Sequence, residues 1–200
     1  MLEKYLIKYC APTLASLKSG SLFNCRCSKD SELNKSISDW NNALMSRGVS
    51  IHLLRRTDTT ALIYVYRQSA LKDTLSDPEI QSFLDGYGYD ACSCCEGCRS
   101  DCCSIENCLK HLESRIIGRN GNSEMRFPHE IGIFLGYPLA DVAGFIKNNG
   151  RNCKCIGTWK VYGDAAYARK AFARYSKCSD VYNRLWKSGK RSVLQLTVAG

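Results

Sequence analysis

The chain has 200 residues, a length that suits one domain over residues 1–200 or a small core with an appendage. Charged residues make up 24% and hydrophobic residues 44%, which excludes a disordered chain and a membrane-embedded one. No apolar run reaches the roughly 18 residues of a spanning helix. Charges interrupt the first eight residues, so we expect no signal peptide and a cytoplasmic location. Two values are unusual: thirteen cysteines and a net charge of +9.

The first part of the chain is predicted to combine helices with a β-hairpin. Apolar spacings of three and four indicate helices, whereas runs rich in β-branched and aromatic residues indicate strands. We expect the chain to residue 23 to be partly helical, with a break or restart at Pro12, and residues 25–27 to form a loop. A helix is expected next, beginning within residues 28–31 and ending at 45. Strands are expected over 49–54 and 61–66, and they should pair as a hairpin.

The second part is predicted to be mainly helical. Helices are expected over 69–75, 77–86, 105–117, 138–149 and 165–187, strands over 155–162 and 193–198, and either a helix or a strand over 127–136. The strand over 155–162, the helix over 165–187 and the strand over 193–198 could form a right-handed parallel crossover. We therefore predict an α+β fold in which about seven helices pack on a mixed sheet of about four strands, with a Cys-rich insertion or loop over 91–108.

Several sequence blocks point to a known family. They are CAPTLA at 10–15, YVYR at 64–67 and above all FPHEIGIFLGYPLADVAGFI at 127–146, with further matches at 159–162, 175–178 and 196–199. Through these blocks nearly the whole chain resembles a family of bacterial proteins, mostly from clostridia, known as domain of unknown function 3793. The resemblance implies a cytoplasmic protein of anaerobes, implies no activity, and suggests a link to flavodoxin and iron uptake. The cysteine-rich stretch departs from the usual family pattern.

The cysteine-rich stretch is the most unusual segment. Its seven cysteines are Cys92, Cys94, Cys95, Cys98, Cys102, Cys103 and Cys108. Four of them, Cys92, Cys95, Cys98 and Cys102, follow the C-x2-C-x2-C-x3-C spacing with which bacterial ferredoxins hold an iron–sulfur cluster. Two features differ from a ferredoxin: Cys103 replaces the proline expected after the fourth cysteine, and the second copy of the run is missing.

Other interpretations of the cysteines stay open. Cys95 and Cys98 with a later cysteine of the run could hold tetrahedral zinc, and thiolates also suit copper(I). The alternative to a metal site is a cysteine-rich loop without a ligand. The pairs Cys25/Cys27 and Cys153/Cys155 could add ligands if they fold near the run, whereas Cys10 and Cys178 are expected to be small buried hydrophobic residues.

Positive charge is concentrated in residues 147–191. This basic segment has twelve Lys and Arg residues against Asp164 and Asp180, a balance of +10, while residues 1–146 are nearly neutral. Such a field attracts an acidic protein, a nucleic acid or an anionic ligand, although a solvated helix face explains the charges equally well. The residues expected to contact a partner are Lys154, Lys160, Arg169, Lys170, Arg174, Lys177, Arg184 and Lys187.

Few residues are candidates for catalysis. His129 and Glu130 could act as an acid–base pair in a pocket with Tyr137, but adjacent residues on a helix diverge by about 100°, and a capping Glu beside a hydrogen-bonded His is the simpler interpretation. No sequence motif of a nucleotide site or a hydrolase is present.

We therefore predict a redox or accessory protein that holds an iron–sulfur cluster or zinc and docks an acidic protein such as flavodoxin. The alternatives are an enzyme that uses His129 and Glu130, and a nucleic-acid-binding protein that uses the basic segment. Aromatic residues interleaved with the basic ones, such as Tyr175, Tyr182 and Trp186, could stack bases. Their helical spacing instead favours a core stripe.

Overall fold

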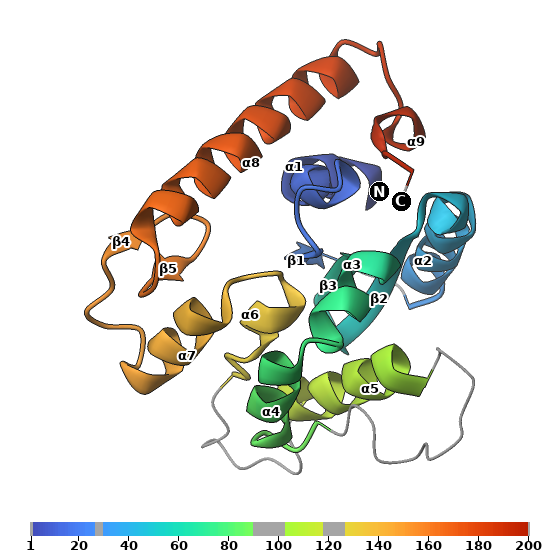
Figure 1. Ribbon diagram of the computed structural model, residues 1–200. Coiled ribbons are helices and arrows are strands. Elements are labelled where there is room, and N and C mark those ends of the chain that lie inside the picture. The colour runs from blue at the N-terminus through green and yellow to red at the C-terminus, as the bar shows by residue number, and fades with distance from the viewer. Residues whose placement is uncertain (1, 27–29, 90–102, 118–126, 200) are drawn as a thin grey trace.

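A three-stranded antiparallel sheet with helices on both faces forms the centre of the protein. In this computed structural model, which describes residues 2–26, 30–89, 103–117 and 127–199, the strand order is β1-β3-β2 (Figure 1). The strands are β1 (Gly20–Arg26), β2 (Val49–Arg56) and β3 (Thr60–Arg67). The central strand β3 is almost continuously buried because helices cover both of its faces. The predicted hairpin over 49–66 is confirmed by the antiparallel pairing of β2 with β3.

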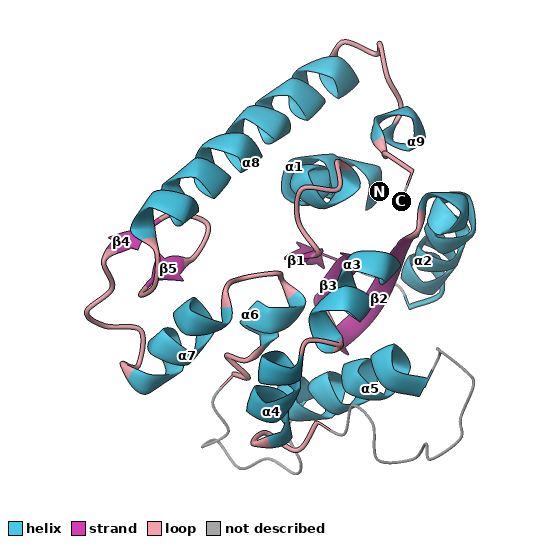
Figure 2. Ribbon diagram, in the orientation of Figure 1, coloured by secondary structure: helices cyan, strands magenta, loops and turns pink. Residues whose placement is uncertain are grey.

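Helices make up most of the described chain (Figure 2). The predicted α+β class is confirmed, but the described residues form nine α-helices rather than about seven. They are α1 (Leu2–Leu14), α2 (Asp30–Leu44), α3 (Gln68–Leu75), α4 (Pro78–Asp85), α5 (Cys103–Ile117), α6 (Ile131–Phe134), α7 (Leu139–Lys147), α8 (Ala165–Lys187) and α9 (Val193–Leu196), with a short 3₁₀ helix, η1, at Met45–Arg47.

The two faces of the sheet form separate cores. On one face, α1, α2, α8 and α9 enclose a cluster that includes Leu6 of α1, Ile63 of β3 and Leu196 of α9. On the other face, Tyr64 of β3 packs with residues of the helices from α3 to α7. The Tyr64 hydroxyl donates to the Phe134 carbonyl at 2.5 Å, which ties α6 to the sheet. A third, smaller cluster around Trp159 joins the first turns of α8 to the segment before it.

Four predictions about strands are wrong. Residues 193–198 do not form a strand: Ser192 and Gln195 make a reciprocal capping box that starts α9. Residues 155–162 form two short strands, β4 (Cys155–Ile156) and β5 (Lys160–Val161), which pair antiparallel. Only glycine fits the turn at position 157, since a Cβ there would lie 2.2 Å from the Phe172 ring. The predicted parallel crossover and the single mixed sheet of four strands are therefore both wrong.

The N-terminal region differs from prediction as well. The helix α1 continues through Pro12 to Leu14, because Cys10, Ala11 and Leu14 bury their side chains in the first core. Strand β1 lies where we predicted helix and loop; its buried and exposed residues alternate, but it contains no β-branched residue that would have marked it as a strand. The open choice for residues 127–136 is resolved in favour of a helix, α6.

Candidate functional site

The basic segment places most of its charges on α8, which runs along the outside of the molecule and packs against α1 (Figure 1). Asp164 begins this 23-residue helix by accepting hydrogen bonds from the backbone amides of residues 166 and 167. Six of the predicted contact residues lie on it with exposed side chains, namely Arg169, Lys170, Arg174, Lys177, Arg184 and Lys187; we call these six residues the α8 cations. In the part of the chain that the structure describes, none of them forms an ion pair.

The apolar side of α8 faces the protein interior. Ala168 and Ala171 are buried, and Tyr175 packs on the Trp159 cluster. Tyr182 and Trp186 pack against the first core, as the predicted core stripe requires. Consequently the aromatic residues of α8 that could have stacked bases are largely used in packing, with Tyr167 the exposed exception.

The other two predicted contact residues lie on the β4–β5 hairpin rather than on α8. Lys154 donates a hydrogen bond to the Gly163 carbonyl at 2.6 Å, and Lys160 donates one to the Gly150 carbonyl at 2.8 Å. These bonds hold both amines close to the backbone.

Most of the cysteine-rich stretch lies outside the described residues, including Cys92, Cys94, Cys95, Cys98 and Cys102. Cys103 is the first residue of α5, and Cys108 is buried in the second core together with Tyr89. Among the described residues, no group of three or more His, Cys, Asp or Glu side chains could hold a metal ion.

The remaining described cysteines are distributed over the fold. Cys10 is buried, as predicted, and burial raises the pKa of its thiol. Cys178 is half-buried on α8, and burial raises its thiol pKa as well. Cys25 is buried in the first core, and Cys153 and Cys155 lie around the β4–β5 hairpin.

His129 and Glu130 point into different surroundings. His129 is exposed, and its ring packs edge-on against Phe145 with centroids 4.8 Å apart. Glu130 is 1% exposed; it accepts hydrogen bonds from Arg115 Nε at 2.5 Å and from the Tyr89 hydroxyl at 3.1 Å. Its side chain does not cap α6. Glu130 thus links the start of α6 to Arg115 of α5 and to Tyr89, which follows α4. It is not placed to exchange a proton with His129.

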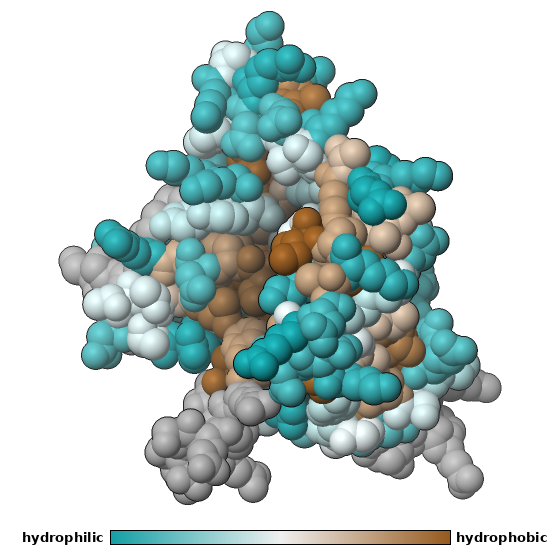
Figure 3. All heavy atoms as spheres, turned by 90° about the vertical axis from the view of Figure 1, so that its left-hand side faces the viewer, coloured by the Kyte–Doolittle hydropathy of each residue, from teal (hydrophilic) through white to brown (hydrophobic). Residues whose placement is uncertain are grey.

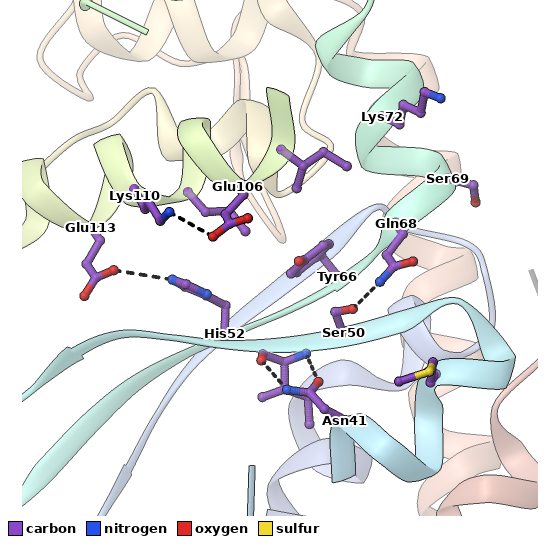
Figure 4. Close-up of a pocket in the computed structure, with 14 residues that line it drawn as sticks. Asn41, Ser50, His52, Tyr66, Gln68, Ser69, Lys72, Glu106, Lys110 and Glu113 are labelled. Atoms are coloured by element: carbon purple, nitrogen blue, oxygen red, sulfur yellow. Dashed lines mark hydrogen bonds and ion pairs between the residues drawn. The ribbon is translucent and has the colours of Figure 1, made fainter. Parts of the chain in front are cut away.

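A cavity of about 760 Å³ lies between the sheet and α5 (Figure 4). From β2, His52 Nε2 lies 3.5 Å from Glu113 Oε2 of α5, in ion-pair range. One turn earlier on α5, Lys110 pairs with Glu106 at 2.8 Å. Each charged side chain labelled on this part of α5 therefore already has a partner. Sequence analysis could not find the His52–Glu113 pair, because its two residues are 61 positions apart.

A smaller cavity of about 310 Å³, the aromatic pocket, lies between α6, α7 and the β4–β5 hairpin. Figure 3 faces this side of the molecule and shows hydrophobic side chains gathered in a hollow. Tyr137 stacks on Trp159 with ring centroids 4.9 Å apart, and Phe145 and His129 form a second aromatic wall. Thus two residues of the enzyme hypothesis, His129 and Tyr137, line one pocket, whereas Glu130 does not.

Asp141 fixes the shape of the aromatic pocket. This buried carboxylate of α7 accepts a hydrogen bond from Trp159 Nε1 at 2.6 Å and from the backbone amides of Tyr162 and Gly163 at 2.7 Å each. The three bonds hold the β4–β5 hairpin against α7 and set the position of the Trp159 ring.

Comparison with known proteins gives one match. A family model described as "Protein of unknown function (DUF3793)" matches residues 6–197. No curated protein and no solved structure matches the chain. Within the described ranges, no helix has both the length and the apolar character needed to cross a membrane.

Proposed function

The chain belongs to the DUF3793 family, and from this premise and the geometry of α8 we propose that it is an accessory protein that docks an acidic protein through the α8 cations. The observation that supports the proposal is an exposed helix of 23 residues whose six cations form no ion pair with another described residue. At 1.5 Å per residue this helix is about 34 Å long, enough to span one side of a standard protein interface.

Two features of α8 favour an acidic protein over a nucleic acid. The inward packing of Tyr175, Tyr182 and Trp186 removes most of the flat surface that single-stranded bases would need. Asp180 is exposed between Lys177 and Arg184, and these residues line a shallow groove of about 480 Å³. A carboxylate within the row of cations repels a continuous phosphate backbone, whereas a protein partner can place a basic residue opposite it.

Binding to flavodoxin, used as a defined acidic probe protein, tests this proposal. We expect the triple variant Lys170→Glu, Arg174→Glu and Lys177→Glu to bind labelled flavodoxin at least tenfold more weakly than the unmodified chain at about 20 mM salt. Each surface pair contributes roughly 0.2–1 kcal/mol, and charge reversal adds repulsion of similar size. Affinity for the unmodified chain should fall at about 150 mM salt, where charges are screened beyond about 8 Å.

The matched control reverses three exposed cations elsewhere, with Lys4→Glu, Lys35→Glu and Arg55→Glu. It changes the net charge by the same amount, so only a local role of α8 makes the two triple variants differ. Equal losses in both variants would contradict docking through α8. Tighter binding to a duplex DNA of about 20 base pairs than to flavodoxin, lost in the α8 variant, would instead support the nucleic-acid alternative.

The second part of the proposal concerns the cysteine-rich stretch, which we propose holds an iron–sulfur cluster or zinc through Cys92, Cys95, Cys98 and Cys102. A feature of the described residues supports it. Tyr89, which precedes the stretch, and Cys108, which is its last cysteine, lie in the same core. The described residues before the stretch and those at its end are therefore held in one core, which supports a compact site between them.

Metal analysis of protein purified without oxygen tests this second part. We expect iron with sulfide, or zinc, in a fixed ratio to protein, and loss of that metal in Cys95→Ser. The control is Cys178→Ser on α8, which should keep the metal. A colourless, metal-free protein whose cysteines in the stretch all react with an alkylating reagent would contradict it.

A further inference from the structure

The aromatic pocket continues into a polar cavity. This second cavity, of about 560 Å³, shares His129 and Phe145 with the aromatic pocket. Its other lining residues are Lys147, Arg151 and three asparagines. The acidic residue in the described lining of the two cavities is Asp141, and hydrogen bonds from Trp159 Nε1 and two backbone amides already occupy both of its oxygens. The polar half of the combined space therefore offers cations and amides, which suit an anion.

The apolar half of the combined space suits a flat ring. Stacked Tyr137 and Trp159 form one wall, with their planes 28° apart, and Phe145 contributes to another. The ammonium of Lys18 lies 4.9 Å from the Tyr137 ring centroid and further restrains that ring. Since these walls are positioned by packing and by Asp141, little ordering would be needed when a ligand enters.

A third cation lies where the two halves meet. Lys160 lines the aromatic pocket, and its Nζ is 5.7 Å from the centroid of Phe145, the ring that both cavities share. Its bond to the Gly150 carbonyl uses one of the three ammonium protons. The two remaining protons can be donated to a ligand at this junction.

We propose that the aromatic pocket and the polar cavity together bind a mononucleotide. The planar base would lie against Trp159 and Phe145, and the phosphate would lie among Lys147, Arg151 and Lys160. A volume of about 310 Å³ falls at the lower end of the range for small-molecule pockets, which suits a base, and the polar cavity leaves room for the sugar phosphate. This recognition uses side chains alone, which is consistent with the lack of a glycine-rich phosphate motif in the sequence.

Calorimetric titration with AMP, adenosine and inorganic phosphate tests the proposal. We expect AMP to bind saturably and adenosine to bind about tenfold more weakly, because it lacks the charge-assisted hydrogen bonds of the phosphate. Arg151→Gln combined with Lys147→Gln should weaken AMP binding by a similar factor and leave adenosine binding unchanged. Both side chains are exposed, so the fold should tolerate their replacement.

A matched pair of variants at the rim separates charge from shape. Ile156 lines the aromatic pocket and is 70% exposed, so Ile156→Glu and Ile156→Gln should both fold. We expect the glutamate variant to bind AMP several-fold more weakly than the glutamine variant, and adenosine equally well. Lys187→Gln, at the opposite end of α8 from the pocket, serves as a distant control and should not change AMP binding.

Three results would overturn the proposal: equal affinities for AMP and adenosine, no saturable AMP binding at millimolar concentration, or equal AMP affinities for the two Ile156 variants. The test is independent of docking through α8. A chain with the three α8 charge reversals should still bind AMP, and a chain that fails to bind AMP can still dock an acidic protein.

Discussion

Replacing Arg67 should destabilise the protein more than replacing any exposed cation. Arg67 is 1% exposed, and its guanidinium donates to the carbonyls of Thr13 at 2.7 Å, Leu14 at 2.6 Å, Val198 at 2.8 Å and Arg47 at 3.3 Å. These carbonyls belong to the end of α1, to η1 and to the segment after α9. One side chain thus connects three parts of the chain that lie far apart in sequence.

The expected loss for Arg67→Met is about 3–5 kcal/mol. Losing one hydrogen bond from a charged donor costs roughly 1.5–3 kcal/mol, but the losses do not add fully because the Thr13 and Leu14 carbonyls keep backbone donors, the amides of Ser16 and Val198. A typical domain has 5–15 kcal/mol of stability, so the variant should still fold. Arg67→Lys should lose less, since an ammonium keeps the charge but cannot reproduce the planar arrangement of donors.

Urea denaturation followed by circular dichroism measures this loss. With a slope of about 2 kcal/mol per molar urea, the midpoint should fall by roughly 1.5–2.5 M. The control is Arg47→Met, which removes one hydrogen bond, to the Thr197 carbonyl at 3.0 Å, and should lose about 1 kcal/mol. Equal midpoints for Arg67→Met and Arg47→Met would refute the reasoning that the shared guanidinium holds these segments together.

Three further predictions concern burial and packing. Burial lowers the pKa of Lys18 to about 8 from its usual 10.5, so between pH 8 and 10 the unfolded chain binds more protons than the folded chain and the unmodified protein gains stability as pH rises. Lys18→Met should therefore be more stable than the unmodified chain by roughly 1–3 kcal/mol at pH 7, and this difference should shrink from pH 8 to pH 10. Urea midpoints of the two chains at each pH measure the difference. Asp141→Asn should lose about 2–3 kcal/mol in thermal unfolding, because its new amide group must face a donor. Gly157→Ala should lose about 1–3 kcal/mol in the same assay, because the added methyl group presses on the Phe172 ring. A loss below about 0.5 kcal/mol would contradict the hydrogen-bond explanation for Asp141→Asn, and the same result for Gly157→Ala would contradict the packing explanation.

Elements with a strong local signal were predicted well. The β2–β3 hairpin follows from its β-branched and aromatic residues, and α4 follows from Asp77, which accepts from the Glu79 and Ile80 amides just before Pro78. The apolar stripe of α8 was also predicted, since its packing obeys helical spacing. In these segments local preference and tertiary packing favour the same structure.

Elements that depend on distant partners were not predicted. Strand β1 is stabilised by its pairing with β3, from Gly20 opposite Tyr66 to Arg26 opposite Thr60, which its own sequence does not reveal. For the candidate sites, the sequence indicated the charge of α8 and placed His129 and Tyr137 in one pocket. It could not indicate that Glu130 would turn away from His129 toward Arg115, because that bond depends on how α5 packs beside α6.

The last described residues lie beside α1 (Figure 1), where the Val198 amide donates to the carbonyl of Leu14, the final residue of that helix, at 3.0 Å. Leu6 of α1 and Leu196 of α9 share one core. During translation, α1 therefore leaves the ribosome well before α8 and α9 exist, and the part of its apolar surface that packs on these two helices stays exposed until they have been synthesised. Such a topology delays completion of this core until α9 has been synthesised and makes the nascent chain a substrate for chaperones that hold exposed apolar segments.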